Sequence, residues 1–479
     1  RIVSLGRRLS ELALQHGDRA AVLLQYADRQ FQQINYATLD AQSNQVARLM
    51  AAAGVAETSR VAIALPNSIE WFVSCFAVWK LGACVFTIRS DLPDWETQRL
   101  FEAARPSHFL GVRPGKNFEG VVQLDIGSLE GVNASILPDR IPKPFKINAT
   151  GGSTGVPKIV VPQTPGVIAV GASAQKDALR LTSGQVQLVA GPLYHYGPSR
   201  NAIAGVTDGH TVVIFERFDP QTTMEAIEQH KVQIGMLVPT MLFRILKLAD
   251  YEKFDVSSLL RMTIAGAKCA DWLFEKAIAV FGPEALFVGY GGTENIGVAS
   301  ATAKEWLSHR GTAGKPIFTD VRIQDEQGNA LMPEEVGEIW MRPHGGVSTA
   351  YLGQEMRQTE DGFATLGDIG WLDPDGYLYV ADRRTDMIVS GGSNVYPAEV
   401  ESALLRHPGI SDAAVVGRPD PEWGTRVHAV LVAFGGALDN KEVKTFCSQL
   451  LAPYKVPRSF EWRDILPRDD LGKLRRSSL

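Results

Sequence analysis

The sequence contains little cysteine and no strong excess of charge of either sign. Its four cysteines, at positions 75, 84, 269 and 447, are scattered among 479 residues without a Cys-x-x-Cys pair. This spacing argues against a disulfide framework and a zinc site, and it is typical of reduced structural thiols in a cytoplasmic protein. The formal net charge of −5 gives no reason to expect nucleic acid as a partner.

Targeting and membrane-spanning segments are not expected either. Residues 1–14 carry charges throughout and lack the apolar centre of a signal peptide. One apolar run, residues 71–88, is interrupted by Lys80-Leu81-Gly82. Its first half has helical spacing, and its second half is typical of a strand. We therefore expect a buried helix–turn–strand there, no transmembrane segment, and a cytoplasmic location.

The length of the chain predicts two or three domains. A hydrophobic content of 45% and a charged content of 21% are those of a globular protein. From residue 60 onward, apolar strands alternate with helical segments, which predicts parallel sheets. The predicted strands are 61–65, 84–88, 145–148, 186–190, 211–215, 234–238, 259–265 and 285–290, and the predicted helices are 69–80, 224–230 and 271–281.

Beyond residue 311 the pattern changes to short strands and turns, with predicted strands at 321–324 and 337–340 and a hairpin turn at 371–377. After residue 383, strands are predicted at 413–416 and 427–434, and helices from Pro397 and at 441–450. The predicted fold class is α/β. A large N-terminal region, residues 1–382, holds two parallel-type α/β subdomains and a small β subdomain at about 311–382, and a small α+β C-terminal domain occupies 383–479.

A glycine-rich loop follows the predicted strand 145–148. Its sequence, Thr-Gly-Gly-Ser-Thr-Gly-Val-Pro-Lys at 150–158, offers backbone N–H groups, hydroxyls and a lysine, which suit an oligophosphate. It is not a Walker A loop, because Val156 and Pro157 separate Gly155 from Lys158. Residues 151–155 also fit the G-x-S-x-G elbow of serine hydrolases, with Ser153 as nucleophile. A flexible loop without a ligand is the third interpretation, and the loop alone leaves all three open.

Three further segments carry groups that suit a nucleotide. Residues 289–294, Gly-Tyr-Gly-Gly-Thr-Glu, follow an apolar strand, where ligands bind in parallel α/β sheets. Tyr290 offers an aromatic face, and the Glu294 carboxylate suits Mg²⁺. Asp368, in Thr-Leu-Gly-Asp at 365–368, is suited to ribose hydroxyls, and Lys473 lies in a glycine loop at 467–473. Each segment also has a simpler interpretation as a glycine turn, a turn-forming aspartate or a solvated tail.

In their order, these motifs resemble those of the acyl-adenylate-forming superfamily, which includes acyl-CoA synthetases, peptide-synthetase adenylation domains and luciferases. The glycine loop is similar to its phosphate-binding motif, residues 290–294 to its Y-G-x-T-E motif, and residues 365–368 to its T-G-D motif. Residues 382–388 resemble its hinge motif, 467–473 its terminal lysine motif, and 192–195 the motif whose His or aromatic residue lies near the acyl carboxylate. The resemblance runs from about residue 35 to the C-terminus. It implies an AMP-forming acid:CoA ligase whose C-terminal domain is mobile about a hinge near 383–386.

The resemblance also implies a role for each matching residue. The implied cofactors are ATP, Mg²⁺ and coenzyme A, and the implied substrate is a carboxylic acid. Lys473 would bridge carboxylate and phosphate in the first half-reaction, and Gly392 would line the pantetheine tunnel in the second. The implied catalytic residues are Lys473, Glu294, Thr293 and His195, with Glu294 also holding the metal. The implied nucleotide- and CoA-binding residues are Thr150, Gly151, Gly152, Ser153, Thr154, Gly155, Lys158, Gly266, Ala267, Tyr290, Gly291, Asp368, Arg383 and Gly392.

The chain departs from the family pattern at two positions. Thr385 stands at the hinge, where Asp or Lys is common, and Leu366 is inserted in the T-G-D motif. No Asp occurs between residues 194 and 200, where amino-acid-activating members carry one, so a plain carboxylic acid is implied.

Three aromatic or apolar candidates for the lining of the acid's pocket, Tyr194, Tyr196 and Met236, predict that this acid is hydrophobic and bulky. A carrier-protein thiol as acceptor, and a serine hydrolase using Ser153 with Asp368 and His407 or His428, are the alternatives. A homodimer is compatible with each of these functions.

Overall fold

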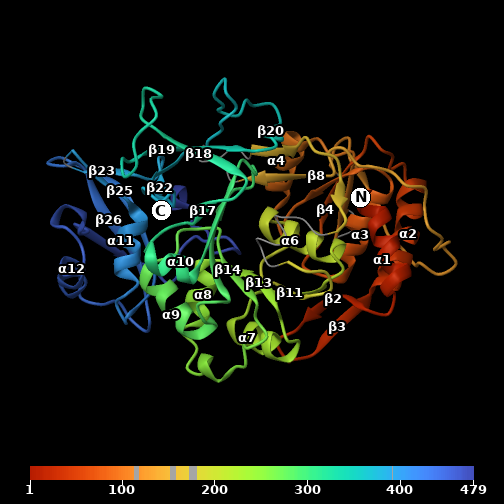
Figure 1. Ribbon diagram of the computed structural model, residues 1–479, viewed down its shortest axis with the longest axis horizontal. Helices are drawn as coiled ribbons and strands as arrows, with labels where there is room; N and C mark the ends of the chain where they lie inside the picture. The colour runs from red at the N-terminus through yellow and green to blue at the C-terminus, as the bar shows by residue number, and fades with distance from the viewer. Residues whose placement is uncertain (113–117, 151–157, 172–180, 391) are drawn as a thin grey trace.

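The structure is a computed structural model that describes residues 1–112, 118–150, 158–171, 181–390 and 392–479, with only the backbone described at Thr150 and Ser477. Two large mixed sheets form its centre (Figure 1). The first has seven strands: β20 (Thr349–Tyr351), β9 (Lys158–Pro162), β8 (Lys146–Thr150), β5 (Cys84–Thr87), β4 (Arg60–Ala64), β6 (His108–Gly111) and β7 (Val122–Gln123), in that order. The second has nine: β17 (Lys315–Pro316), β16 (Val298–Thr302), β15 (Leu286–Gly291), β14 (Arg261–Ile264), β13 (Ile234–Leu237), β11 (Val186–Val189), β12 (Thr211–Phe215), β2 (Ala20–Gln25) and β3 (Phe31–Asn35).

Helices cover both faces of each sheet, because alternate strand residues point to opposite sides. In β4, Val61 and Ile63 join one core cluster and Ala62 and Ala64 another. The cluster between the sheets includes helices α1 (Leu5–His16), α2 (Tyr36–Ala52), α3 (Ile69–Lys80) and α6 (Tyr196–Thr207). Helix α4 (Asp94–Ala104) packs on the outer face of the seven-stranded sheet, and α7 (Pro220–Gln229), α8 (Pro239–Ile245) and α9 (Asp271–Phe281) pack on the outer face of the nine-stranded one.

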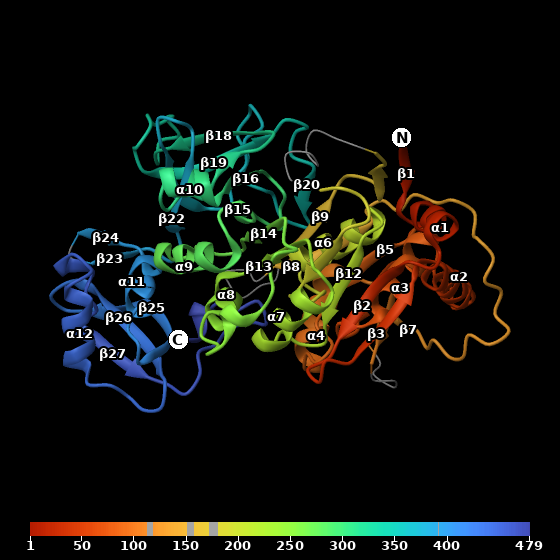
Figure 2. The ribbon, with the colours of Figure 1, turned by 60° about the horizontal axis from the view of Figure 1, so that its bottom comes forward.

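The remaining chain forms the β subdomain and the C-terminal domain. The β subdomain is an antiparallel sheet of β18 (Thr319–Gln324), β19 (Gly337–Pro343), β21 (Asp368–Leu372) and β22 (Leu378–Arg383), preceded by α10 (Ala303–Ser308). The C-terminal domain contains β23 (Ile388–Ser390), β24 (Ser393–Val395), α11 (Pro397–Leu404), β25 (Ile410–Asp420), β26 (Gly424–Ala433), α12 (Asn440–Ser448) and β27 (Ser459–Trp462). A separate short pair joins β1 (Ile2–Ser4) to β10 (Val167–Ala169). Figure 2 shows the C-terminal domain beside α9, on the side opposite to the N-terminal helices.

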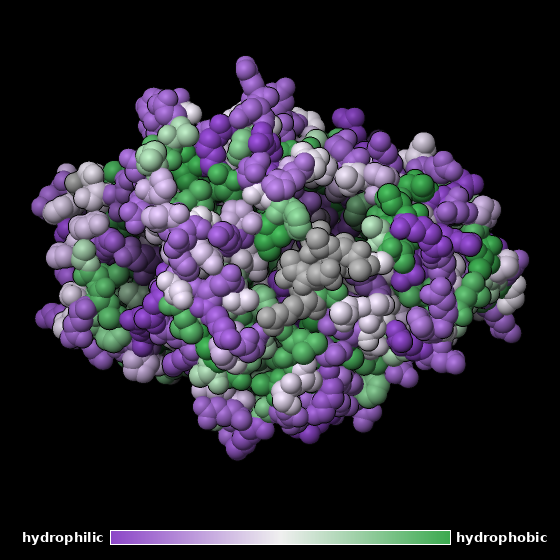
Figure 3. Space-filling model, in the orientation of Figure 1, coloured by the Kyte–Doolittle hydropathy of each residue, from purple (hydrophilic) through white to green (hydrophobic). Residues whose placement is uncertain are grey.

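The apolar run at 71–88 forms the predicted helix–turn–strand. The Ser68 side chain accepts the Trp71 N–H and begins α3, and Gly82, at φ +75°, makes the turn into β5. Among the described residues, no helix is long and apolar enough to cross a membrane. On the face shown in Figure 3, polar residues cover the protruding parts, with apolar residues between them.

The α/β prediction is confirmed, with two differences. The sheets are mixed rather than parallel, since β3, β9, β16, β17 and β20 run antiparallel to their neighbours. Strand β20 also leaves the expected β subdomain and pairs with β9. No local pattern predicts this long-range pairing.

Two buried lysines, Lys80 at the end of α3 and Lys146 in β8, differ in their partners. Lys80 Nζ lies 2.6 Å from Asp40 Oδ1 and also donates to Asn44 and Ser43 side chains. Lys146, which is 3% exposed, donates to Ser199 Oγ, and no carboxylate among the described residues pairs with it. Burial lowers the pKa of Lys146 to about 7. Lys146 is therefore a cost to stability at neutral pH.

We expect Lys146→Met to raise the free energy of unfolding, by an amount that shrinks as pH rises. The folded pKa lies below the ordinary value of 10.5, so between those values the unfolded chain binds one more proton. Wild-type stability then rises through this window by about 1.4 kcal/mol per pH unit, and the variant lacks this contribution. Urea unfolding of both proteins from pH 7 to 10 measures the difference.

Lys80→Met is the matched comparison and should destabilise the protein, because it leaves Asp40 buried and unpaired. Parallel pH curves for wild type and Lys146→Met would contradict the assignment.

Candidate active site

The predicted site residues lie where strands of the two large sheets end. Thr150 is the last residue of β8, residues 190–195 follow β11, and Gly291 ends β15. Residues 151–155 of the glycine loop lie outside the described residues. Thr150 pairs with Lys158 across β8 and β9, so the two residues that flank the loop are held side by side.

Tyr290, Asp368 and Arg383 form one group. The Tyr290 hydroxyl donates to Asp368 Oδ2 over 2.6 Å, and Arg383 Nε lies 3.6 Å from Asp368 Oδ1. Burial, and next the Asp368 carboxylate, raise the pKa of Tyr290 well above its ordinary value, so the phenol keeps its proton. Asp368 begins β21 directly opposite Arg383 in β22. This register brings the carboxylate of Asp368 and the guanidinium of Arg383, both from one hairpin, to the end of β15.

Glu294 is held by a residue that the motifs did not reveal. The Tyr351 hydroxyl, from β20, donates to Glu294 Oε1 over 2.8 Å, and Lys158 Nζ lies 5.1 Å from the centre of the Tyr351 ring. Tyr351 therefore joins the end of the glycine loop to Glu294. Gly292, in the same turn as Glu294, lies close to Leu366, since a Cβ there would be 2.7 Å from the Leu366 side chain. Thr293 lies in the same turn and is half-buried.

The loop that carries Lys473 reaches this group from the C-terminal domain. Asp469 Oδ1 accepts the N–H groups of Leu471 and Lys473, which gives the loop its turn. The Lys473 side chain is exposed, yet its surroundings lower its pKa. Desolvation is the largest cause and Arg383 the second, whereas Asp469, Glu294 and Asp368 act in the opposite direction. The loop itself touches the N-terminal region, because the Tyr194 hydroxyl donates to Asp470 Oδ2 over 2.9 Å and Thr240 Oγ1 donates to the Leu471 carbonyl over 3.3 Å.

His195 faces the same loop. Its Nε2 atom is buried and has no hydrogen-bond partner among the described residues, and Asp469 Oδ2 lies 3.9 Å away. Burial lowers the pKa of His195 to about 4, so the imidazole is neutral near pH 7. It is packed against the Tyr194 ring, with 4.3 Å between the ring centres. A neutral, orphaned imidazole suits a wall of the acid's site better than a general base.

Other predicted residues stand apart from these contacts. Gly266, at φ +91°, and Ala267 follow β14 and are exposed. Gly392, at φ +79°, lies in the turn between β23 and β24. That hairpin is on the outer side of the C-terminal domain, away from β8 and β15 (Figures 1 and 2). The structure thus brings the lysine loop, but not the Gly392 turn, to the residues that follow β11 and β13.

Comparison with protein-family models decides the family. The model described as AMP-binding enzyme matches residues 9–352, and the model described as AMP-binding enzyme C-terminal domain matches residues 399–473. The chain belongs to the AMP-binding enzyme family. This confirms the resemblance to the acyl-adenylate-forming superfamily in its acyl-CoA synthetase branch.

Relatives of this AMP-binding enzyme match along nearly all of its length. It is 32% identical to the 2-succinylbenzoate–CoA ligase of Bacillus velezensis over 96% of the chain and 95% of the relative. It is 33% identical to a feruloyl-CoA synthase of Amycolatopsis sp over 92% of each protein.

A solved relative, o-succinylbenzoate CoA synthetase (MenE) from Bacillus subtilis, provides two states for comparison. Its complex with the acyl-adenylate intermediate OSB-AMP is 29% identical, with a TM-score of 0.85 over 100% of this chain and 98% of that one. A double mutant of the same protein bound to the product analogue OSB-NCoA gives a TM-score of 0.70 over the same shares of the two chains. The AMP-binding enzyme described here is therefore more similar in shape to the adenylate-bound state.

Proposed function

We propose that this enzyme activates a hydrophobic, bulky carboxylic acid as its acyl-adenylate and transfers the acyl group to coenzyme A. The enzyme is an acyl-CoA synthetase, and ATP, Mg²⁺ and CoA are the cosubstrates and ion of this reaction. One observation supports the proposal for the site: the loop that carries Lys473 comes from a different domain, yet it contacts Tyr194, His195 and Thr240, which follow strands of the nine-stranded sheet. A lysine so placed suits a step in which two anions, the carboxylate of the acid and a phosphate of ATP, must approach each other, because its positive charge offsets their repulsion.

In the first half-reaction, a carboxylate oxygen of the acid attacks the α-phosphorus of ATP. A bond forms between that oxygen and phosphorus, and the bond to pyrophosphate breaks. Lys473 offsets the repulsion between the two anions and the charge that develops on the phosphorus oxygens. The ends of the glycine loop, at Thr150 and Lys158, hold the phosphates, and Asp368 with Arg383 holds the ribose beside Tyr290. In the second half-reaction the CoA thiolate attacks the acyl carbon, and AMP leaves.

Glu294 fits the role of the metal ligand. Its carboxylate offers the hard oxygen atoms that Mg²⁺ prefers, and its orientation is fixed by the hydrogen bond from Tyr351. Within the described residues, no group of three or more His, Cys, Asp or Glu side chains could hold a metal ion. A single protein carboxylate is typical of Mg²⁺ bound mainly through substrate phosphates. When bound, the ion offsets charge on the phosphate oxygens.

Residues on α6 and β13 support a hydrophobic acid. Met236 lies in β13, and its methyl carbon would be 3.6 Å from a Cβ added at Gly197 in α6. Beside this contact, Tyr196 and the neutral His195 add aromatic surface. The relatives whose names are given above act on acids with an aromatic ring. We propose an aryl or similarly bulky acid as the first class to test.

The hydrolase alternative has less support. Asp368 is bonded to Tyr290 and adjoins Arg383, whereas His407 and His428 contact Glu442 and Ser459 within the C-terminal domain. Neither histidine contacts Asp368, so the described residues do not assemble a triad.

ATP–pyrophosphate exchange across a panel of aryl, fatty, steroid and terpenoid acids tests the proposed function. We expect exchange to require Mg²⁺ and to be fastest with a bulky hydrophobic acid. Adding CoA, or a pantetheine-bearing carrier protein, then identifies the acceptor by the thioester formed. A serine-directed phosphonate is the control for the alternative. No exchange with any acid, together with a stable adduct on Ser153, would contradict the ligase assignment.

A further inference from the structure

The tip of the lysine loop contacts the N-terminal region through an acidic side chain to which the family motif gives no role. The Tyr194 hydroxyl donates to Asp470 Oδ2 over 2.9 Å, and Arg89 Nη1 lies 3.6 Å from the same oxygen. We propose that Asp470, through Tyr194 and Arg89, positions Lys473 for adenylate formation and so favours the adenylating orientation of the C-terminal domain. This inference rests on the proposed function. It concerns three positioning residues rather than the reacting groups.

The residues that receive Asp470 are fixed in the N-terminal region. Thr87, the last residue of β5, donates its hydroxyl to the Tyr194 carbonyl over 3.2 Å. Arg89 follows β5 by two residues and is also paired with Asp91. The Tyr194 ring packs on His195. Asp470 therefore contacts a surface that is held by the central strand β5 and by the turn that begins α6.

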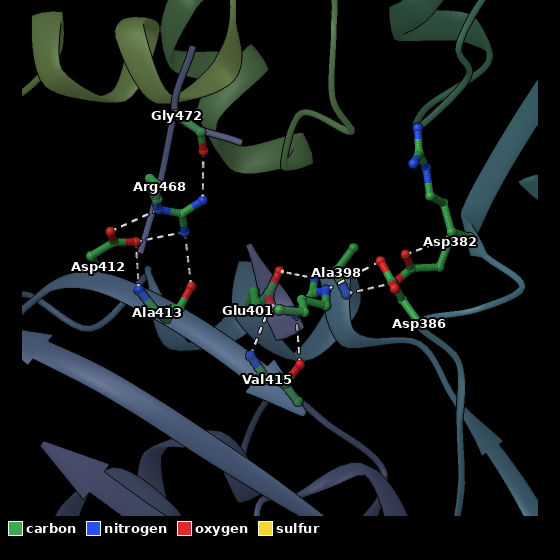
Figure 4. A network of polar contacts seen from close by, with 11 residues as sticks. Asp382, Asp386, Ala398, Glu401, Asp412, Ala413, Val415, Arg468 and Gly472 are labelled. Atoms are coloured by element: carbon green, nitrogen blue, oxygen red, sulfur yellow. Dashed lines mark hydrogen bonds and ion pairs between the residues drawn. The ribbon is translucent and has the colours of Figure 1, made fainter. Parts of the chain in front are cut away.

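Asp470 is rigidly connected to Lys473. Arg468 donates through Nη1 to the Gly472 carbonyl over 2.8 Å, and its other nitrogens bind the Asp412 carboxylate at 2.8 and 2.7 Å (Figure 4). The Asp469 carboxylate holds the N–H groups on the inside of the turn. A bound position of Asp470 therefore fixes the position of the lysine three residues later.

The same body includes Asp386, the last residue of the hinge segment 383–386. Arg476 Nε lies 3.3 Å from Asp386 Oδ2, and Arg476 Nη1 lies 2.6 Å from Glu401 Oε1 and donates to the Val415 carbonyl. Arg476, which follows Lys473 by three residues, thus joins the end of the lysine loop to Asp386, α11 and β25. Rotation about Thr385 would carry the loop away as a unit, and it would break both contacts of Asp470 at once.

Some contacts across the two regions lie at the hinge itself, where the Ala398 N–H donates to Asp382 Oδ2 over 2.9 Å and Arg384 Nη2 lies 3.1 Å from Glu326 Oε1. Away from the hinge, further contacts are weaker or less specific. Thr240 Oγ1 donates to the Leu471 carbonyl over 3.3 Å, Trp272 Nε1 donates to the Ser402 carbonyl over 3.2 Å, and Lys247 Nζ lies 5.0 Å from the Phe434 ring. None of these contacts pairs full charges. The carboxylate of Asp470, in contrast, accepts a charge-assisted hydrogen bond and adjoins a guanidinium.

The expected size of the effect is modest. The Asp470 side chain is 46% exposed, so solvent screens the ion pair. A contribution that changes the population of one orientation by about three- to tenfold is consistent with a hydrogen bond to a charged group. A stronger contact would oppose the release that the second half-reaction needs.

The two half-reactions, measured separately, test this inference. In Asp470→Ala we expect kcat for acyl-AMP formation to fall about three- to tenfold with little change in KM for ATP. Thioester formation from supplied acyl-AMP and CoA should not slow. Asp470→Glu, which keeps the charge, should restore much of the first rate. Asp464→Ala removes an exposed carboxylate from the same domain and should leave both rates unchanged.

A double-mutant cycle tests the contact itself. Tyr194→Phe should slow acyl-AMP formation less than Asp470→Ala, and the combined variant should be no slower than Asp470→Ala alone. Fully additive losses would show that the two side chains act separately, and equal slowing of both half-reactions by Asp470→Ala would show a merely structural role. Either result overturns the inference.

Spin-label distances give a readout that does not depend on turnover. Labels on Glu130→Cys and Lys444→Cys, both exposed sites in the two regions, report the domain orientation in the intact enzyme. In the labelled enzyme that retains Asp470, we expect one dominant distance between the labels. In the Asp470→Ala variant, we expect a second distance with a substantial population. An unchanged distance distribution overturns the inference whatever the result of the exchange assay. A failed exchange assay with a shifted distribution would instead contradict only the proposed function.

Discussion

Lys473→Ala is expected to lower the rate of acyl-AMP formation by about a hundred- to a thousandfold, the usual loss when one donor to a developing negative charge is removed. Lys473 lies in the loop by which the C-terminal domain contacts the residues that follow β11 and β13. In the proposed reaction, its charge acts when carboxylate and α-phosphate meet. Quenched-flow measurement of acyl-AMP from acid and ATP gives this rate.

The second half-reaction provides the contrast. If the C-terminal domain rotates before CoA attacks, Lys473 is no longer in the site, and the variant should convert supplied acyl-AMP and CoA at a near-normal rate. Lys444→Ala, an exposed lysine of α12, controls for loss of positive charge on the same domain. Equal slowing of both halves in Lys473→Ala would contradict the alternation of domain orientations.

Glu294→Gln is expected to lower kcat by about a hundredfold or more, because an ion that stabilises the transition state contributes several kcal/mol. Glutamine keeps an oxygen that accepts the Tyr351 hydrogen bond, so the local packing is preserved and only the charge is lost. The Mg²⁺ concentration that gives half-maximal exchange should rise in parallel. Titration of exchange with Mg²⁺ measures both effects.

Glu360→Gln is the matched control, since Glu360 is an exposed carboxylate of the same region. It should leave the Mg²⁺ dependence unchanged. An unaltered Mg²⁺ dependence in Glu294→Gln would remove Glu294 from the metal site and leave its contact with Tyr351 as a purely structural one.

Local sequence patterns predicted much of the fold. The segments 69–80 and 271–281 form α3 and α9 as expected, and 211–215 forms β12, because apolar periodicity and helix ends are local signals. The helix predicted at 224–230 begins at Pro220, where Asp219 caps it. Strand β20 was missed, since its three residues depend on pairing with β9, far away in the sequence.

Motifs indicated the identity of the site but not its internal contacts. The pairing of Asp368 with Tyr290 and of Glu294 with Tyr351 depends on where β21 and β20 lie relative to β15, which the sequence does not state. Asp470 was visible in the lysine motif, yet its partners Tyr194 and Arg89 come from distant segments. Such contacts between domains have no period or spacing by which they can be recognised.

Transfer of ¹⁸O from the substrate carboxylate tests the central claim most directly. If the acid attacks the α-phosphorus of ATP, the AMP released after thioester formation must carry one oxygen from the acid. Mass spectrometry of AMP from a turnover with ¹⁸O-labelled acid and unlabelled water should therefore show one ¹⁸O atom per AMP. Label in inorganic phosphate instead, or AMP without label, would contradict activation through an acyl-adenylate.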